Sequence, residues 1–277
     1  MESFFSFLEK RVDDCSSLLC IGLDPHAADL PAKTAASALD FCRKLIKAGA
    51  PYAAAFKPNA AFFEVLGPEG WAALKSVVEA VQAESDRLGS RIPVILDAKR
   101  GDIASTADAY AQSAFQNLGV DAITLNPYLG RDSIEPFIKN RENGVFLLCK
   151  TSNPGSADIQ DLPVFETGVK TSTPLYVHIA RMAQGWNDFN NVGLVVGANH
   201  PQVMAEVRSA VPQMWILAPG IGSQGGELEA ALKAGLRRDG KGMLINVSRS
   251  LARASNPTAA AAEMRDNIVN IKRELGY

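Results

Sequence analysis

Short apolar runs recur along the chain and are separated by longer segments of mixed polarity. Eight runs rich in Val, Ile, Leu and Ala each end at a polar residue, Gly or Pro: 18–23, 52–56, 93–96, 122–125, 145–149, 192–196, 214–218 and 243–247. Runs that are apolar throughout are typical of strands buried on both faces, as in a parallel sheet with helical crossovers. The pattern therefore predicts eight parallel strands.

The segments between the runs show the three- and four-residue apolar spacing of amphipathic helices. The predicted helices cover 33–48, 71–88, 103–118, 174–184, 226–236 and about 257–275, with a further helix starting near His200 and a short one within 1–14. Eight strand–helix units in 277 residues predict a TIM (β/α)8 barrel, and a doubly wound open sheet is the alternative. Because no linker or change of composition interrupts the chain, we expect one domain over 1–277 with an N-terminal helix.

Charge and cysteine content narrow the class of protein. The 28 Lys and Arg nearly balance the 30 Asp and Glu, which predicts no field that would attract nucleic acid or a membrane surface. No apolar run approaches the roughly 20 residues that span a bilayer, and the N-terminus lacks the layout of a signal peptide. The four cysteines form no CxxC motif, so we expect neither a disulfide framework nor a zinc site, and a cytoplasmic location.

Charged residues follow several of the predicted strands. The active site of a TIM barrel lies at the C-terminal ends of its strands, so these positions converge on one pocket. Asp24 follows the first run, Lys57 the second, and Asp97 and Lys99 the third. A solvated rim would explain any one of these charges, but it explains four together less well. We therefore expect a functional site at this end of the barrel.

The segment Asp97-Ala-Lys99-Arg-Gly-Asp102 is the densest charge cluster at these strand ends. Strand alternation predicts that Asp97 and Lys99 share one face and point into the mouth, while Gly101 permits a turn that places Asp102 at a helix start. Carboxylates beside a lysine keep it protonated, which suits a proton donor better than a Schiff-base nucleophile. Lys57 would extend this array of alternating signs. A structural ion-pair network is the alternative.

The loops after the last two strands have the composition of a phosphate site. Loops at these positions commonly bind phosphate in TIM barrels, and here they contain glycines between 220 and 226, Gln224, Ser248 and Arg249. Glycines that serve only tight turns are the alternative. The glycines also match the dinucleotide fingerprint GxGxxG. That fingerprint requires an acidic residue after the next strand and further strand–helix units, and the chain offers neither, so we reject it.

Other residues and segments give weaker indications of function. His26, His178 and His200 lack metal-ligand spacing, and no metal site is predicted. Ser152, after the fifth run, is placed to bond a substrate amide or simply to form a turn. The polar connection 155–173 is long for a compact domain, which predicts a lid that closes over bound ligand.

The segment 94–106 resembles the signature of the orotidine 5'-phosphate decarboxylase family, DxKxxDI followed by Thr. Further motifs occur in the family's order along most of the chain: Gly22-Leu-Asp24, Phe56-Lys57-Pro58, Thr151-Ser-Asn-Pro-Gly155, the glycine segment 219–226 and Ser248-Arg249. The length and Asn126-Pro-Tyr-Leu-Gly130 resemble the longer bacterial subgroup, although many relatives differ at Asn126-Pro127 and after the fifth strand. The resemblance implies a (β/α)8 barrel that converts orotidine 5'-monophosphate (OMP) to UMP and CO2 without metal or cofactor.

The resemblance also implies a role for each matching residue. Asp97 would lie against the substrate carboxylate, and Lys99 would protonate C6 of the pyrimidine as CO2 leaves. Asp102 and Thr106 would enter the partner's site, which makes a homodimer the functional unit. The implied substrate-binding residues are Asp24 and Lys57 for the ribose (Lys57 also holding Asp97), Ser152 for the pyrimidine amide, and Gln224, Ser248 and Arg249 at the phosphate end.

Two other functions are compatible with the same barrel. Metal-dependent sugar-phosphate aldolases of the same superfamily carry an acidic metal ligand at the end of the second strand, where this chain has the cation Lys57. A non-catalytic nucleotide-binding barrel would gain little from crowding Asp97 and Asp102 around Lys99 beside an acidic substrate. Both are therefore less favoured than the decarboxylase.

Overall fold

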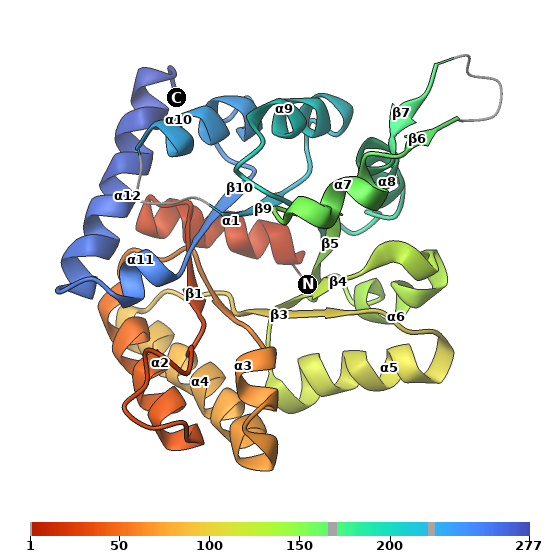
Figure 1. Ribbon diagram of the computed structural model, residues 1–277. Helices are drawn as coiled ribbons and strands as arrows, with labels where there is room; N and C mark the ends of the chain where they lie inside the picture. Colours follow the sequence, from red (N-terminus) through yellow and green to blue (C-terminus); the bar gives the residue numbers. More distant parts are fainter. Residues whose placement is uncertain (1, 166–170, 221–224) are drawn as a thin grey trace.

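Eight parallel strands form a closed barrel in the computed structural model, which describes residues 2–165, 171–220 and 225–277 (Figure 1). The strands are β1 (Leu19–Leu23), β2 (Ala55–Pro58), β3 (Ile95–Arg100), β4 (Ala122–Leu125), β5 (Gly144–Lys150), β8 (Val192–Val196), β9 (Ile216–Pro219) and β10 (Met243–Val247). They pair in the order β2-β1-β10-β9-β8-β5-β4-β3, and parallel bridges Phe56–Val94 and Asn59–Asp97 join β2 to β3. This closure confirms the TIM barrel and excludes the open sheet.

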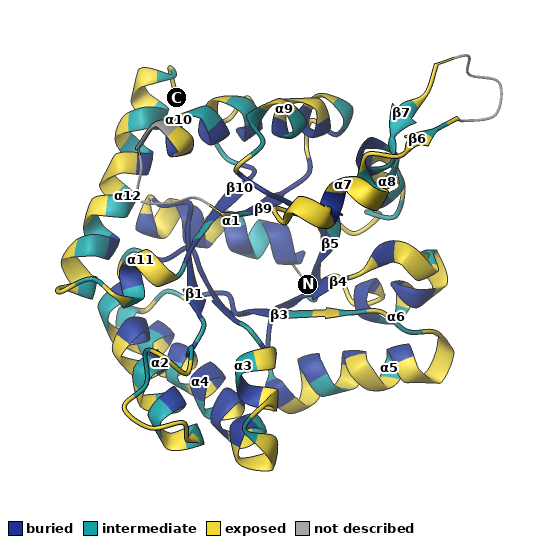
Figure 2. Ribbon diagram, viewed as in Figure 1, coloured by how far each residue is buried: buried dark blue, intermediate teal, exposed yellow. Residues whose placement is uncertain are grey.

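Each of the eight apolar runs overlaps one barrel strand. Every residue of β1, β4 and β8 is buried, because the strands face the barrel interior on one side and helices on the other (Figure 2). That double burial is the reason the runs are apolar throughout. The largest difference from the prediction is at β3, which continues past the apolar run to Arg100.

Helices surround the strands and expose their outward faces (Figure 2). They are α2 (Ala35–Gly49), α3 (Ala61–Glu64), α4 (Gly67–Leu88), α5 (Ala104–Gln112), the π-helix η1 (Ser113–Leu118), the 3-10 turns η2 (Pro127–Leu129) and η3 (Arg131–Ser133), α6 (Glu135–Ile138), α8 (Leu175–Gly185), α9 (Pro201–Ala210), α10 (Gly225–Gly235), α11 (Arg249–Ala252) and α12 (Pro257–Glu274). The predicted helices are confirmed, with 103–118 divided into α5 and η1. No helix in the described ranges is both long and apolar enough to cross a membrane.

The N-terminal helix α1 (Phe4–Cys15) covers the end of the barrel where the strands begin (Figure 1). Phe5 packs edge-on against Phe146 and stacks on Trp215, with ring centroids 5.6 and 5.9 Å apart. A side chain at Gly193, at the start of β8, would bring a Cβ to 2.8 Å from the Phe5 ring, so the missing side chain makes room for the aromatic plug. This plug leaves the opposite end of the barrel as the opening.

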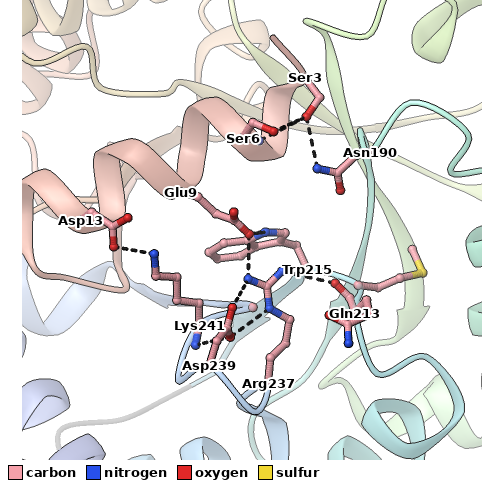
Figure 3. A network of polar contacts seen from close by, with 12 residues as sticks. Ser3, Ser6, Glu9, Asp13, Asn190, Gln213, Trp215, Arg237, Asp239 and Lys241 are labelled. Carbon is pink, nitrogen blue, oxygen red and sulfur yellow. Dashed lines mark hydrogen bonds and ion pairs between the residues drawn. The ribbon is translucent and has the colours of Figure 1, made fainter.

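Ion pairs hold α1 in this position (Figure 3). The guanidinium of Arg237 lies 2.7 Å from Glu9 of α1 and 2.7 Å from Asp239, and Glu9 also accepts a hydrogen bond from the Trp215 indole. One turn further along α1, Asp13 pairs with Lys241 at 2.5 Å. The N-terminal helix is therefore joined to the β9–β10 side of the barrel by both packing and charge.

The connection after β5 contains local structure that the sequence did not predict. It begins with η4 (Pro154–Ser156) and α7 (Ala157–Gln160), and a hairpin of β6 (Pro163–Val164) and β7 (Thr173–Pro174) then stands away from the barrel (Figure 1). Residues 166–170 lie outside the described residues. Whether 155–173 closes over a ligand stays a prediction.

Candidate active site

A pocket of about 990 Å³ opens at the C-terminal ends of the strands. Four of the predicted site residues line it: Lys57, Asp97, Lys99 and Ser152. The residues come from β2, β3 and the loop after β5, so three strand ends converge there as expected for a TIM barrel. Leu148, Val195 and Leu217 form an apolar part of its wall.

The centre of the pocket is a carboxylate held between two ammonium groups. Asp97 Oδ2 lies 2.8 Å from Lys57 Nζ, and Asp97 Oδ1 lies 2.6 Å from Lys99 Nζ. The side chains of Lys57 and Asp97 are 5% and 12% exposed, whereas Lys99 is 49% exposed. Lys57 is thus an internal partner of Asp97, and Lys99 is the cation available to a ligand.

This environment shifts the titration of the two buried groups in opposite directions. Burial by itself raises the pKa of Asp97, but the charges and hydrogen bonds of Lys57 and Lys99 outweigh it, so the pKa lies well below the usual carboxyl range. Burial lowers the pKa of Lys57, but the charges of Asp97 and Asp24 raise it further than burial lowers it. At neutral pH the site therefore keeps a carboxylate and a buried ammonium side by side.

The backbone at the end of β3 departs from a regular strand. Leu96 pairs with Ile123 and Arg100 with Leu125, so three residues of β3 face the single residue Thr124 of β4. Lys99 lies within this bulge at φ 47°, in the left-handed region that side-chain-bearing residues seldom adopt. Asp97 and Lys99 both reach the pocket, as predicted, but through the bulge and not through the simple strand alternation from which the prediction was made.

Asp24 directly follows β1, which pairs with β2, the strand that carries Lys57. Its Oδ1 is buried and accepts no hydrogen bond within the described part of the chain, although buried polar atoms ordinarily find a partner. A Cβ at Gly22 would lie 3.1 Å from Asp24 Oδ2 and 2.7 Å from the Cβ of Ser248, so the glycine allows these two side chains to approach. The unpartnered oxygen marks Asp24 as a candidate ligand contact.

Asp102 and Thr106 lie apart from the central ion pairs of their own chain. Asp102 follows β3, and its Oδ1 accepts a hydrogen bond from the backbone N–H of Ile103 at 2.8 Å; over the described ranges it forms no ion pair with Lys99. Thr106 is exposed in the first turn of α5. The structure therefore places neither residue against the Lys99 of the same chain.

The predicted phosphate end is described in part. Ser248 is half-buried at the end of β10, next to β1 in the barrel, and Arg249 is exposed at the start of α11. Gln224 lies outside the described residues. Ser152 faces the pocket from the loop after β5, close enough to Gly197 that a Cβ there would lie 3.1 Å from the Cβ of Ser152.

Thr124 is a site residue that sequence reasoning missed. Its side chain is buried, lines the pocket and donates a hydrogen bond to Asp97 Oδ1 at 3.0 Å. The available signal is a single hydroxyl within an apolar four-residue strand. That signal did not indicate a function, since a lone Thr is common in buried strands.

Comparison with known proteins identifies the family to which the chain belongs. Residues 17–264 match the Orotidine 5'-phosphate decarboxylase / HUMPS family. The chain belongs to this family. It is 46% identical over 267 residues to the orotidine 5'-phosphate decarboxylase of Roseiflexus castenholzii, covering 95% of this chain and 93% of that protein. The corresponding protein of Thermomicrobium roseum is 45% identical over 284 residues, with 99% and 97% covered.

Solved structures agree with the family assignment. The structure of Leishmania donovani OMP decarboxylase matches with a TM-score of 0.86 and 53% sequence identity, covering 98% of this chain and 99% of that chain. The family expected from the sequence is therefore confirmed. Because this match comes from Leishmania donovani, relatives this similar are not confined to the bacterial subgroup that the sequence suggested.

The family name covers more than one kind of enzyme, so the residues at the strand ends are needed to distinguish between the possible reactions. Over the described ranges, no group of three or more His, Cys, Asp and Glu side chains is arranged to hold a metal ion. The end of β2 carries the ammonium of Lys57, already paired with Asp97. A cation at this position opposes the binding of a divalent metal there.

Proposed function

We propose that this chain catalyses the decarboxylation of orotidine 5'-monophosphate to UMP and CO2, a step of de novo pyrimidine biosynthesis. The observation that carries the proposal is the Lys57–Asp97–Lys99 array at the barrel mouth, in a pocket large enough for a nucleotide. The curated relatives of Roseiflexus castenholzii and Thermomicrobium roseum bear the same enzyme name over almost their whole length.

In this mechanism Lys99 meets the charge that develops on the pyrimidine. Breaking the bond between C6 and the carboxylate releases CO2 and leaves an electron pair on C6, which the ring delocalises poorly. The ammonium of Lys99 stabilises this pair and then transfers a proton to form the C6–H bond. Because Asp97 fixes Lys99 Nζ at 2.6 Å before substrate arrives, little reorganisation is needed at the moment of reaction. Asp97 itself would lie against the departing carboxylate.

The remaining predicted contacts hold the rest of the nucleotide. Asp24 and Lys57 bind the ribose hydroxyls, and the unpartnered Asp24 Oδ1 supports this role. Ser152 reads the pyrimidine amide from the loop after β5. The phosphate is bound by Gln224, Ser248 and Arg249. Phosphate binding far from the reacting carbon contributes to transition-state stabilisation, provided that it helps to close the site.

We further propose that the functional unit is a homodimer in which Asp102 and Thr106 enter the partner's site. Asp102 is not paired with Lys99 of its own chain, and beside it Ile103 is 53% exposed. Tyr128, which lines the pocket, is 83% exposed. Apolar side chains exposed at the rim of a site are typical of an interface that another chain covers.

The Arg100 side chain connects the elements of this rim. It forms an ion pair with Glu64 of α3 and lies 5.2 Å from the Tyr110 ring centroid of α5. These contacts make α3, the end of β3 and α5 one continuous surface. We also propose a cytoplasmic location, because all four cysteines are buried and unpaired, as expected in a reducing compartment.

Release of CO2 from OMP in the presence of EDTA tests the proposal. Activity that is unchanged by EDTA supports the decarboxylase. Absence of CO2 release from correctly folded protein would sink it. Activity on a hexulose phosphate that requires magnesium would favour the aldolase relatives, and UMP binding without turnover of either substrate would favour a non-catalytic barrel.

A further inference from the structure

Thr124 makes three hydrogen bonds that together join the backbone of β3 to the catalytic carboxylate. Its Oγ1 lies 3.0 Å from Asp97 Oδ1, 3.1 Å from the backbone nitrogen of Ala98 and 3.0 Å from that of Lys99. Thr124 is 1% exposed, so its hydroxyl is shielded from solvent on the Thr124 side of these contacts. All three partners belong to the segment that carries the proposed proton donor.

The direction of each bond follows from the chemistry of a hydroxyl. A threonine hydroxyl has one proton to donate and two lone pairs to accept with. The N–H groups of Ala98 and Lys99 occupy the two lone pairs. The proton must therefore point to Asp97 Oδ1, the same oxygen that accepts from Lys99 Nζ at 2.6 Å. Every hydrogen-bonding position of Thr124 is in use.

The bulge explains why such a residue is needed at this place. Three residues of β3 face Thr124 alone, so the N–H groups of Ala98 and Lys99 find no carbonyl of β4 in regular register. Backbone N–H groups that lose their partner in the sheet are unfavourable where they are shielded from water, and Lys99 also adopts an unfavourable φ of 47°. The Thr124 hydroxyl supplies the acceptor that these N–H groups lack in the sheet. It thereby stabilises the segment in which Lys99 has its unfavourable φ.

We propose that Thr124 is a positioning residue that sets the backbone of Lys99 and the carboxylate orientation of Asp97 for the reaction. It acts through these two residues and transfers no proton to the substrate. This role rests on the proposed decarboxylase function. The prediction is specific to the hydroxyl group, because valine has almost the same shape as threonine but can neither donate nor accept.

The test compares Thr124→Val and Thr124→Ser with Ile123→Val, a control that removes a methyl group from the neighbouring buried position of the same strand. For Thr124→Val we expect kcat to fall about 100-fold, the scale of a displacement near 1 Å, with KM and the Kd for UMP within about threefold of the parent. Thr124→Ser keeps the hydroxyl and should restore kcat to within about fivefold of the parent. Ile123→Val should leave kcat unchanged.

Two results would overturn the role of Thr124: a folded Thr124→Val enzyme whose kcat stays within about threefold of the parent, or a Thr124→Ser enzyme as deficient as Thr124→Val. If Thr124→Val does not fold, Thr124→Cys replaces it under the same criteria, because a thiol is only a weak donor and acceptor.

A parent protein without activity would instead refute the proposed function. In that case a crystal structure of Thr124→Val decides, since Lys99 should leave its positive φ, and an unchanged segment would reject the proposal.

Discussion

Lys57 and Asp97 form an ion pair between β2 and β3, with Nζ 2.8 Å from Oδ2, at the place where the barrel closes. The two strands are otherwise joined by only the isolated bridges Phe56–Val94 and Asn59–Asp97 among the described residues. The pair therefore links the site to the closure of the fold. The same contact that would orient Asp97 for the proposed reaction also adds a side-chain link between two strands that share only isolated backbone bridges in the described residues.

Replacing Lys57 by Met should destabilise the protein strongly. The substitution keeps the length of the side chain but leaves the carboxylate of Asp97, 12% exposed, without its buried partner. Removing one partner of a buried pair typically costs about 3–5 kcal/mol of unfolding free energy, and because Asp97 keeps its contact with Lys99 at 2.6 Å we expect the lower end of that range. Urea denaturation measures this loss. The matched control is Lys10→Met, which breaks the exposed pair with Glu2 and should cost about 1 kcal/mol or less. Equal losses in the two variants would contradict the structural role of the pair.

The contribution of this pair to stability should depend on pH only at the extremes. Asp97 has a lowered pKa, so it stabilises the folded state above the ordinary value of 3.8, and this contribution is lost as the pH falls through the folded value. Lys57 has a raised pKa, so its contribution is present below 10.5 and is lost as the pH rises through the folded value. The difference in unfolding free energy between the parent and a Lys57→Met/Asp97→Leu variant should stay constant from about pH 5 to 9 and shift against the parent outside that window. A shift centred near pH 7 would show that this assignment is wrong.

Lys99→Ala should abolish turnover but leave nucleotide binding measurable. The variant removes the ammonium that stabilises and protonates C6, and we expect kcat to fall by at least about 10⁴-fold. UMP binding, followed by calorimetry, should persist because the predicted phosphate and ribose contacts remain. Lys139→Ala is the control, since Lys139 also pairs with an aspartate, Asp108, at 2.8 Å but lies outside this pocket. Near-normal turnover in Lys99→Ala would remove Lys99 from the role of proton donor.

The sequence was most informative where one physical constraint acts on many residues. Double burial makes the strands of the barrel apolar throughout, and so their number and order were predictable. The C-terminal ends of those strands then located Asp24, Lys57, Asp97 and Lys99. The bulge in β3 was not predictable, because it depends on hydrogen bonds between the Thr124 hydroxyl and the backbone of another strand. A local pattern contains no sign of such a contact.

Binding of UMP should protect the segment 155–173 from proteolysis if that segment acts as a lid. At its base, Lys150 of β5 pairs with Asp161 at 2.5 Å, and Gln160 accepts a hydrogen bond from the backbone of Thr151, so the segment is attached next to the loop that carries Ser152. We expect limited proteolysis within it to slow at least about tenfold at saturating UMP. Cleavage at other sites serves as the internal control. Equal cleavage of the segment with and without UMP would count against the lid.

Mixing two inactive variants tests whether each site is shared between two chains. Lys99→Ala and Asp102→Ala proteins should each have little activity, because one lacks the proton donor and the other lacks the proposed carboxylate of the partner's site. If subunits exchange at random, half of the dimers contain one chain of each kind. Each such dimer has one site with both native residues and one site with neither, so the mixture should regain about a quarter of the parent's activity.

The expected recovery depends on the crossing of Asp102 and not on dimer formation alone. If Asp102 served the Lys99 of its own chain, no combination of the two variants would contain an intact site, and mixing would restore nothing. A mixture of Asp102→Ala with Thr106→Ala is the informative control. Both residues are predicted to enter the same partner site, and each chain in this mixture lacks one of them. No site can therefore receive both native residues from one partner, so this mixture should regain no intact sites. Recovery in both mixtures would leave Asp102 shared between chains and remove Thr106 from the partner's site, because Thr106 would then serve its own chain.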